Sequence, residues 1–190
     1  MVTTSYHHGD LRRVLVAEAG ALVAESGARH LSLREVARRA GVSQTAPYRH
    51  FEDKEDLLAA VAAEGFGALA RHTAERASGG RTARTRLRRG SLAYVEFATA
   101  NPGLFRLMFS GPRYHRSDQA RSAYRAWVDL VVGAQRSGDV APGSTGRKAR
   151  ALWSLIHGVA DLAVNGHLAE GEWSRLAGEA IDAMVSGMGT

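Results

Sequence analysis

The stretch G-V-S-Q-T-A-P-Y-R-H-F, residues 41–51, lies between two segments in which apolar residues recur at helical spacing. Gly41 suits the left-handed backbone of a tight bend, and Ser43 is a good residue to cap a helix. The remaining residues mix a proline with aromatic, basic and polar side chains, which is unusual for a core helix. The stretch therefore predicts a helix-turn-helix, with its turn at 41–43 and a short helix over 43–51.

Two different faces are expected on the short helix over 43–51. Residues four apart share one side of a helix, so Gln44 and Tyr48 project together, with Thr45 beside them. Pro47 and Phe51 fall on the opposite side, toward the preceding helix. The polar face is therefore predicted to be exposed.

Pro47 occupies the fourth position of this predicted helix. Because proline has no N–H, it deletes the first helical bond, the one to the carbonyl of Ser43. We expect no further disturbance along the helix, and we expect Val42 to fill the small core behind it.

The exposed face carries the chemistry that DNA recognition requires, since the second helix of such a pair can lie in the major groove. Gln44 can bond adenine with two hydrogen bonds, and Thr45 can contact a base through its hydroxyl or its methyl group. Tyr48, His50 and Lys54 can each donate to a phosphate oxygen. A helix-turn-helix can also be a plain packing corner, with His50 as a core histidine, so these residues alone leave both interpretations open.

The rest of the chain predicts an all-α fold. Apolar residues recur at helical spacing nearly everywhere, and no convincing strand pattern is present. Ser32 and Glu35 form a capping-box pattern, and Asp53 suits the cap of a long helix that ends before Ser78. Besides 43–51, helices are expected over 10–26, 32–41, 53–78, 82–100, 102–109, 117–137, 144–165 and 172–187.

The composition bounds the class of protein. The 190 residues allow one compact domain or a small module joined to a larger body, and 45% hydrophobic with 23% charged residues predicts a globular chain. The absence of cysteine excludes disulfides, a thiolate nucleophile and a cysteine-based zinc site. No apolar run is long enough for a membrane span, and no signal-peptide pattern is seen, so a cytoplasmic protein without a membrane partner is expected.

Positive charge is concentrated in one short region. The chain has a net charge of +6, and the segment 71–89 alone holds seven arginines against a single acidic residue, Glu75. A solvated hinge and helix face is one explanation, and a supplementary phosphate contact is the other. The arginines are Arg71, Arg76, Arg81, Arg84, Arg86, Arg88 and Arg89.

The run L-R-E-V-A-R-R-A-G-V-S-Q-T-A-P-Y-R-H-F-E-D-K-E-D-L-L, residues 33–58, resembles the DNA-binding domain of the TetR/AcrR family of bacterial transcription regulators. The resemblance covers about 6–69 and includes the G-V-S turn and the Y-x-H-F close. It implies an all-α fold of about nine helices. A helix-turn-helix domain would span 6–69, and an effector-binding and dimerisation domain would span 70–190.

The same resemblance implies the DNA-binding residues. Arg34 falls where the family often reads a base from the second helix, and Pro47 departs from the leucine that is common at its position. The implied DNA-binding set is Arg34, Ser43, Gln44, Thr45, Tyr48, Arg49, His50 and Lys54.

Two segments of the C-terminal part, F-R-L-M-F-S at 105–110 and W-S-L-I-H-G at 153–158, resemble the subgroup marked by a W-x-x-x-H-G segment. From spacing alone, Trp153, His157 and Gly158 share one helix face, and the glycine would admit a close neighbour. Core packing and a pocket wall are both open explanations for that face.

The resemblance further implies a repressor that binds a near-palindromic operator on double-stranded DNA as a homodimer. The last two helices, 144–165 and 172–187, would form the dimer, with a seam of Ile156, Ala160, Val164, Leu176, Ala180 and Met184. A small apolar or amphipathic inducer would bind among the middle helices and release the DNA. Its expected pocket residues are Phe66, Tyr94, Phe97, Phe105, Met108, Phe109, Trp127, Trp153 and His157.

A hydrolase or metal-dependent enzyme is the main alternative from another class. The eight histidines form no H-E-x-x-H or similar pattern, and G-S-T-G-R-K at 143–148 is too short for a phosphate-binding loop. We therefore expect no enzymatic activity, no metal and no cofactor. A regulator without an inducer, whose C-terminal body only dimerises, is a third possibility.

Overall fold

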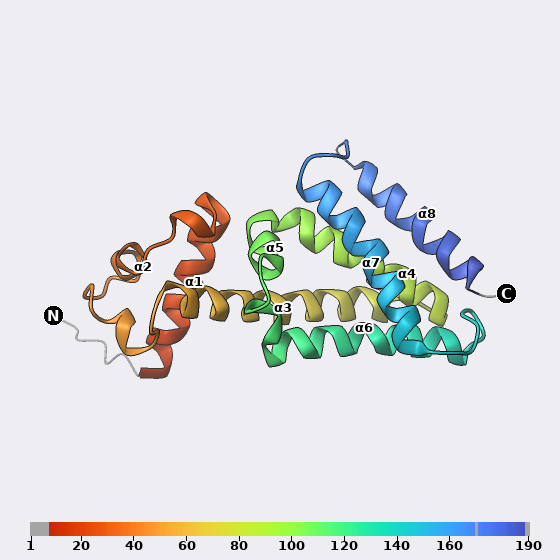
Figure 1. The fold of residues 1–190 in the computed structure, drawn as a ribbon, viewed down its shortest axis with the longest axis horizontal. Helices are drawn as coiled ribbons and strands as arrows, with labels where there is room; N and C mark the ends of the chain where they lie inside the picture. Colours follow the sequence, from red (N-terminus) through yellow and green to blue (C-terminus); the bar gives the residue numbers. More distant parts are fainter. Residues whose placement is uncertain (1–7, 170, 189–190) are drawn as a thin grey trace. The chain divides into compact units, whose positions relative to one another are not determined.

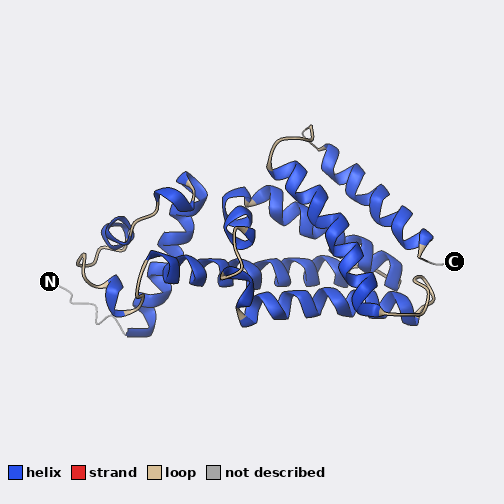
Figure 2. Cartoon of the chain, viewed as in Figure 1, coloured by secondary structure: helices blue, strands red, loops and turns tan. Residues whose placement is uncertain are grey.

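The structure, a computed structural model, describes residues 8–169 and 171–188. These residues contain eight α-helices, three short 3₁₀ helices and no strand, which confirms the all-α prediction (Figures 1 and 2). The α-helices are α1 (His8–Ser26), α2 (Leu33–Arg39), α3 (Lys54–Ser78), α4 (Ala83–Ala100), α5 (Pro102–Phe109), α6 (Asp118–Arg136), α7 (Thr145–Val164) and α8 (Glu172–Gly187). The 3₁₀ helices are η1 (Ala28–His30), η2 (Pro47–Arg49) and η3 (Tyr114–Arg116).

The described chain divides into two compact units. The first holds the residues up to Gly65 together with Gly103–Ser117, and the second holds Phe66–Pro102 together with the residues from Asp118 on. The predicted DNA-binding domain over 6–69 begins at Tyr6, which lies outside the described residues, and its boundaries stay a prediction.

The helix starts in the first unit follow from their capping residues. The Glu35 N–H donates to Ser32 Oγ at 3.2 Å, and the Asp56 N–H donates to Asp53 Oδ1 at 2.7 Å. Only half of the predicted capping box forms at Ser32, because the Glu35 carboxylate accepts hydrogen bonds from Arg38 instead. The unit's core is apolar and comes from α1, α2 and α3, including Leu15, Ala19, Val23, Val36, Ala37, Leu57 and Leu58.

The predicted α-helix over 43–51 is wrong, since only the 3₁₀ turn η2 (Pro47–Arg49) forms there. The Ser43 carbonyl accepts from the Ala46 N–H at 3.0 Å, three residues on, and the Arg49 N–H in turn donates to the Ala46 carbonyl at 3.2 Å. The proline ring would clash with a carbonyl four residues back, so the chain adopts the tighter spacing. The effect of Pro47 therefore extends over the whole turn.

In the second unit, α4 is the central helix and packs against α6, α7 and α8. Its start is fixed by a capping box in which Thr82 and Thr85 bond each other's backbone N–H groups. Gly90 allows a close approach, because a Cβ at that position would lie 2.7 Å from Leu130 Cδ1 of α6.

The basic segment 71–89 is largely occupied by contacts within the second unit. The Arg86 Nε–H donates to the Gly80 carbonyl at 3.0 Å, which fixes the loop before α4. The Arg88 Nε–H donates to Asp182 Oδ2 on α8 at 3.0 Å. The five arginines with such partners are Arg76, Arg84, Arg86, Arg88 and Arg89. These contacts favour the hinge and helix-face explanation over a phosphate site.

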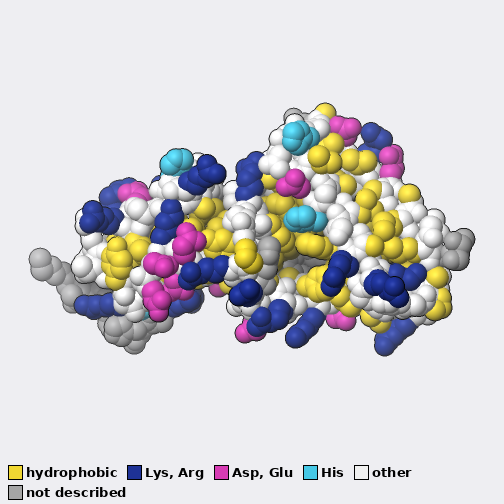
Figure 3. Space-filling model, viewed as in Figure 1, with side chains coloured by type: hydrophobic (Ala, Val, Ile, Leu, Met, Phe, Trp, Pro, Cys, Tyr) yellow, Lys and Arg dark blue, Asp and Glu magenta, His cyan; other side chains and the backbone are white. Residues whose placement is uncertain are grey.

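The prediction that Ile156, Ala160 and Val164 of α7 form part of the dimer seam is wrong. Ile156 and Ala160 are fully buried within their own chain, and Val164 is 9% exposed, so none can form a seam with another copy. The exposed side of α7 instead carries Leu162, which is 42% exposed. On α8 the predicted residues Leu176, Ala180 and Met184 are half-buried. Figure 3 shows hydrophobic side chains exposed over these two helices.

None of the helices within residues 8–169 and 171–188 combines the length and the hydropathy that a bilayer span requires.

We expect Pro47→Leu to convert η2 into an α-helical turn. The leucine keeps apolar bulk at a buried position and adds the N–H that can donate to the Ser43 carbonyl. Backbone Cα chemical shifts over 43–51 should move toward α-helical values, whereas Pro142→Leu, in a loop of the second unit, should leave them unchanged. Unchanged shifts in Pro47→Leu would show that the proline does not cause the 3₁₀ geometry.

Candidate functional site

The turn between α2 and α3 presents a polar face to solvent. Gln44, Thr45 and Tyr48 are exposed, and Tyr48 keeps 55% of its surface accessible. Pro47 and Phe51 are buried on the other side, Phe51 with only 1% exposed. The predicted division into two faces is therefore confirmed, although the backbone is a 3₁₀ turn.

The buried side of the turn is held by specific contacts. The Val42 N–H donates to the Ala37 carbonyl of α2 at 3.0 Å, and the Phe51 N–H donates to the Pro47 carbonyl at 3.0 Å. The Arg12 guanidinium of α1 lies 5.1 Å from the centre of the Phe51 ring, a cation–π contact. These contacts fix the exposed side chains on a rigid support.

A network of charged side chains connects α1 and α2 beside this turn. Arg39 binds the Glu25 carboxylate through two hydrogen bonds of 2.7 and 2.5 Å, and Arg38 binds Glu35 at 2.9 and 2.6 Å. The hydrogen bond from Arg38 lowers the pKa of Glu35 to about 2, and Arg39 lowers the pKa of Glu25. Arg34 is exposed and takes no part in this network.

Two predicted phosphate-binding residues are less accessible than expected. His50 is half-buried, and so is Lys54, whose Nζ donates to the Arg29 carbonyl of η1 at 2.8 Å. An ammonium group has three donors, so Lys54 can hold η1 and still donate to a phosphate. Ser43 and Arg49 are exposed.

The nine predicted effector-binding residues fall into both units. The first unit contains Phe105, Met108 and Phe109; the Phe105 and Phe109 rings lie 4.9 Å apart, and Met108 is fully buried. The second unit contains Phe66, Tyr94, Phe97, Trp127, Trp153 and His157. Trp127 acts as a structural residue, because its indole N–H donates to the Ala149 carbonyl of α7 at 3.1 Å.

Three residues of the second unit, Tyr94, Trp153 and His157, form a polar aromatic cluster, which we call the Tyr94 cluster. The Tyr94 hydroxyl and His157 Nδ1 are 2.8 Å apart, and the His157 ring stacks on Trp153 at 4.9 Å. Trp153 also hydrogen-bonds Tyr94, and an indole N–H can only donate. The Tyr94 hydroxyl therefore accepts from Trp153 and also lies in hydrogen-bond contact with His157 Nδ1, which joins the three side chains.

Burial keeps the Tyr94 hydroxyl protonated. Tyr94 is only 5% exposed, and burial raises the pKa of its hydroxyl well above the usual range. Sequence reasoning identified the three residues separately but missed their connection, and it also missed Tyr124, whose ring meets Trp153 edge-on at 6.4 Å. The expected close neighbour of Gly158 is wrong, since no atom lies within 4 Å of a Cβ built there.

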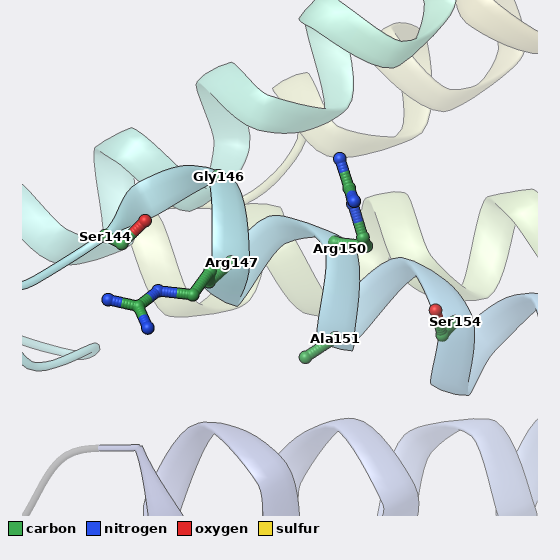
Figure 4. A pocket seen from close by; sticks show the side chains of 6 residues that line it. All are labelled: Ser144, Gly146, Arg147, Arg150, Ala151 and Ser154. Carbon is green, nitrogen blue, oxygen red and sulfur yellow. The ribbon is translucent and has the colours of Figure 1, made fainter.

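A surface groove of about 490 Å³ lies along the N-terminal part of α7. Figure 4 shows the Arg147 and Arg150 side chains extending from α7 in different directions. Its lining residues are Ser144, Gly146, Arg147, Arg150, Ala151 and Ser154. None of the six was among the predicted effector-binding residues.

A small helical unit with an exposed helix-turn-helix face, in a chain whose second unit is also all-helical, defines the class of DNA-binding regulators with a separate C-terminal domain. Comparison with known proteins agrees with this class. Residues 15–61 match the family model of bacterial regulatory proteins of the tetR family, and residues 87–188 match the tetracyclin repressor-like C-terminal domain. The chain belongs to the TetR family and is a DNA-binding transcription regulator.

Solved structures share the fold over nearly the whole chain. A protein of unknown function from Rhodococcus sp. RHA1 is 35% identical with a TM-score of 0.84, covering 98% of this chain and 100% of that one. A TetR family transcription regulator from Marinobacter aquaeolei VT8 is 23% identical with a TM-score of 0.67, covering 91% and 94%. The fatty acid degradation regulator FadR from Bacillus halodurans is 14% identical with a TM-score of 0.68, covering 92% and 98%.

The charge network predicts how Glu35 titrates. Arg38→Ala removes the hydrogen bonds that contribute most to the lowered pKa, so the pKa of Glu35 should rise from about 2 toward its ordinary value of 4.5. In the wild type the pair stabilises the fold above about pH 4.5, and this contribution is lost as the pH falls toward 2.

A carboxyl-carbon NMR titration measures this shift. Arg34→Ala is the matched control, because it removes an arginine from the same helix without touching Glu35, and it should leave the titration unchanged. An equal shift in both variants would mean that the general field of α2, not the Arg38 contact, sets the pKa.

Proposed function

We propose that the chain is a repressor that binds a near-palindromic operator as a homodimer and is released by a small inducer. The proposal rests above all on the exposed set Gln44, Thr45 and Tyr48, held on a rigid turn by the buried Pro47 and Phe51. A polar face of this kind is exposed to solvent and matches the edges and phosphates of a DNA groove. We assign residues 6–69 to DNA binding and 70–190 to effector binding and dimerisation.

Within the DNA-binding unit we divide the residues by role. Gln44, Thr45 and Arg34 would contact base edges, because amide, hydroxyl and guanidinium groups can distinguish base pairs. Residues that would contact the phosphate backbone carry donors and sit around the same face: Ser43, Tyr48, Arg49, His50 and Lys54. The 3₁₀ turn is short, so we expect few base contacts and a large backbone contribution.

We propose that the dimer forms through the outer sides of α7 and α8. Leu162 on α7 is exposed, and Leu176 and Met184 on α8 are half-buried, so an apolar strip remains uncovered in the single chain. Covering that strip with a second copy would place two DNA-binding units at a fixed spacing, which is why a near-palindromic operator is expected.

We propose that the Tyr94 cluster recognises the inducer. A hydrogen-bonded tyrosine and histidine within an apolar helical body fit a ligand that is mostly apolar and carries one polar group. The W-x-x-x-H-G segment supplies two of the three residues, Trp153 and His157, which supports placing the chain in that subgroup. Inducer binding would favour a state of the dimer that fits the operator poorly.

We assign no enzymatic activity to the chain, because the family to which it belongs consists of transcription regulators. We place it in the cytoplasm, where operator DNA is accessible. Selection of bound sequences from a random DNA library, at a stated salt concentration, tests the proposal directly. We expect enrichment of one near-palindromic sequence, which should then be protected in the DNA upstream of this or a neighbouring gene. Failure to enrich any sequence would contradict operator binding.

Replacing Tyr48 and Gln44 should separate backbone contacts from base contacts. Tyr48→Ala should weaken binding to all DNA sequences alike, by about 1–3 kcal/mol, because a phosphate contact carries no sequence information. Gln44→Ala should instead reduce the preference for the selected operator over other DNA. Competition binding assays with the operator and with unrelated DNA measure both effects, and an equal loss of preference in the two variants would contradict this division.

Replacing Tyr94 should impair the response to an inducer. A thermal-shift screen with apolar and amphipathic compounds should first find one that raises the Tm and releases operator DNA. Tyr94→Phe leaves the Trp153 N–H and His157 Nδ1 without the hydroxyl that connects them, so we expect about tenfold weaker binding of that compound, equivalent to ~1.4 kcal/mol. Operator binding without the compound should persist.

Tyr124→Phe is the matched control for this experiment. It removes a hydroxyl from another tyrosine that contacts Trp153, but one that is 37% exposed and lies edge-on. It should respond like the wild type. A normal response of Tyr94→Phe would exclude the Tyr94 cluster from inducer recognition, and a screen without any active compound would favour a regulator that only dimerises.

A further inference from the structure

Arg12 of α1 holds its guanidinium over a residue that anchors the DNA-binding turn. The guanidinium carbon lies 5.1 Å from the centre of the Phe51 ring. Phe51 is only 1% exposed, and its N–H donates to the Pro47 carbonyl of η2 at 3.0 Å, so the ring has a fixed position on the buried side of the turn. Arg12 itself is exposed. The protein therefore orders this guanidinium and still leaves the residue accessible to solvent.

The positive charge of Arg12 is not compensated within the part of the chain that the structure describes. Its guanidinium forms no ion pair and no hydrogen bond among residues 8–169 and 171–188. By contrast, Arg38 and Arg39 of α2 bind the carboxylates of Glu35 and Glu25. A carboxylate partner neutralises an arginine locally, whereas an aromatic ring leaves the net charge in place. Arg12 is thus an ordered cation with its charge unspent.

Arg12 also lies in the same part of the unit as the residues that we propose for phosphate binding. His50 directly precedes Phe51 in the chain, and Lys54 begins α3 three residues after it. The guanidinium lies over the ring that stands between these two residues. A phosphate that approaches the turn and the start of α3 would therefore meet the Arg12 charge as well.

The chemistry of a guanidinium group suits this role. When an arginine lies over an aromatic ring, the face of its plane is used and the N–H groups at the edge remain able to donate. Two of these N–H groups can bind one phosphate group together. An arginine that is already ordered loses less side-chain entropy on binding than a fully mobile one. The Phe51 ring thus prepares Arg12 for an anionic partner.

We propose that Arg12 is a further DNA contact, whose guanidinium, held over Phe51, donates to a phosphate oxygen of the DNA backbone. This inference rests on the proposed DNA-binding face and extends that face from the turn and the start of α3 to α1. A phosphate contact carries no base information, so it would add affinity for every DNA sequence. It would also help to fix the register of the turn on the duplex, because phosphate contacts orient a protein on DNA.

Three substitutions of Arg12 separate a phosphate contact from a packing role. Arg12→Met removes the charge but keeps an unbranched side chain that packs well on an aromatic ring. Arg12→Gln is a second neutral variant, with a polar side chain. Arg12→Lys keeps the charge without the planar fork. The matched control is Arg125→Met, which makes the same change of net charge at an exposed position of α6 in the second unit.

Fluorescence anisotropy at several salt concentrations measures the Kd of each chain for the selected operator and for an unrelated duplex of the same length. At low salt we expect both neutral variants to bind both DNAs about tenfold more weakly than the wild type, with the ratio of the two Kd values unchanged. The slope of log K against log salt concentration should become shallower by about 0.9 for each copy of the chain on the DNA. Arg12→Lys should keep the slope of the wild type, and so should Arg125→Met.

A purely structural role for Arg12 would give a different result. Neutral variants with the wild-type slope, at normal or at reduced affinity, would overturn the phosphate contact and leave the rest of the DNA-binding face in place. An equal change of slope in Arg125→Met would assign the effect to overall charge and would also overturn it. Circular dichroism and thermal melting verify the fold, and unfolding of both neutral variants would show that Arg12 acts on the fold instead. A wild-type chain that binds neither DNA would contradict the proposed function itself.

Discussion

The packing of α4 is the constraint on which the second unit depends. This helix lies against α6, α7 and α8, and its Gly90 has no side chain where Leu130 of α6 approaches most closely. The fully buried Ser91 hydroxyl is satisfied within the helix by the Leu87 carbonyl at 2.7 Å. Two side chains of α4 contact its neighbours. Tyr94 hydrogen-bonds His157 of α7, and Arg88 donates to Asp182 of α8. The positions of both outer helices therefore follow from contacts with a single element.

Because α4 covers the inner sides of α7 and α8, it determines what their outer sides can do. Ile156 and Ala160 are buried in the core, whereas Leu162 is exposed. The inducer-recognising cluster that we propose and the dimer face that we propose would then lie on opposite sides of the same helix, α7. A ligand that displaces His157 would move α7 directly, so coupling between the two sites needs no longer chain of intermediate residues.

The sequence predicts the helices well where a capping residue is present, as at Ser32, Asp53 and Thr82, since one side chain fixes each start. The prediction fails at 43–51, because it accounts for the hydrogen bond that the proline deletes but not for the clash of the proline ring with a carbonyl four residues back. Periodicity also could not tell which side of α7 faces the core, because apolar residues lie on both. The Tyr94–His157 contact joins positions 63 residues apart, which no local pattern can reveal.

The density of arginines along the sequence does not predict which arginines are unpaired in the folded chain. The segment 71–89 holds the densest positive charge, yet five of its arginines bind carboxylates, a hydroxyl or backbone carbonyls of the second unit. Arg147 and Arg150 belong to no dense cluster, yet they have no partner within the described chain. A buried or paired arginine adds to the net charge without offering a contact. Availability for an external contact is therefore a property of the folded chain, and the exposed arginines include Arg34 and Arg49 on one unit and Arg147 and Arg150 on the other.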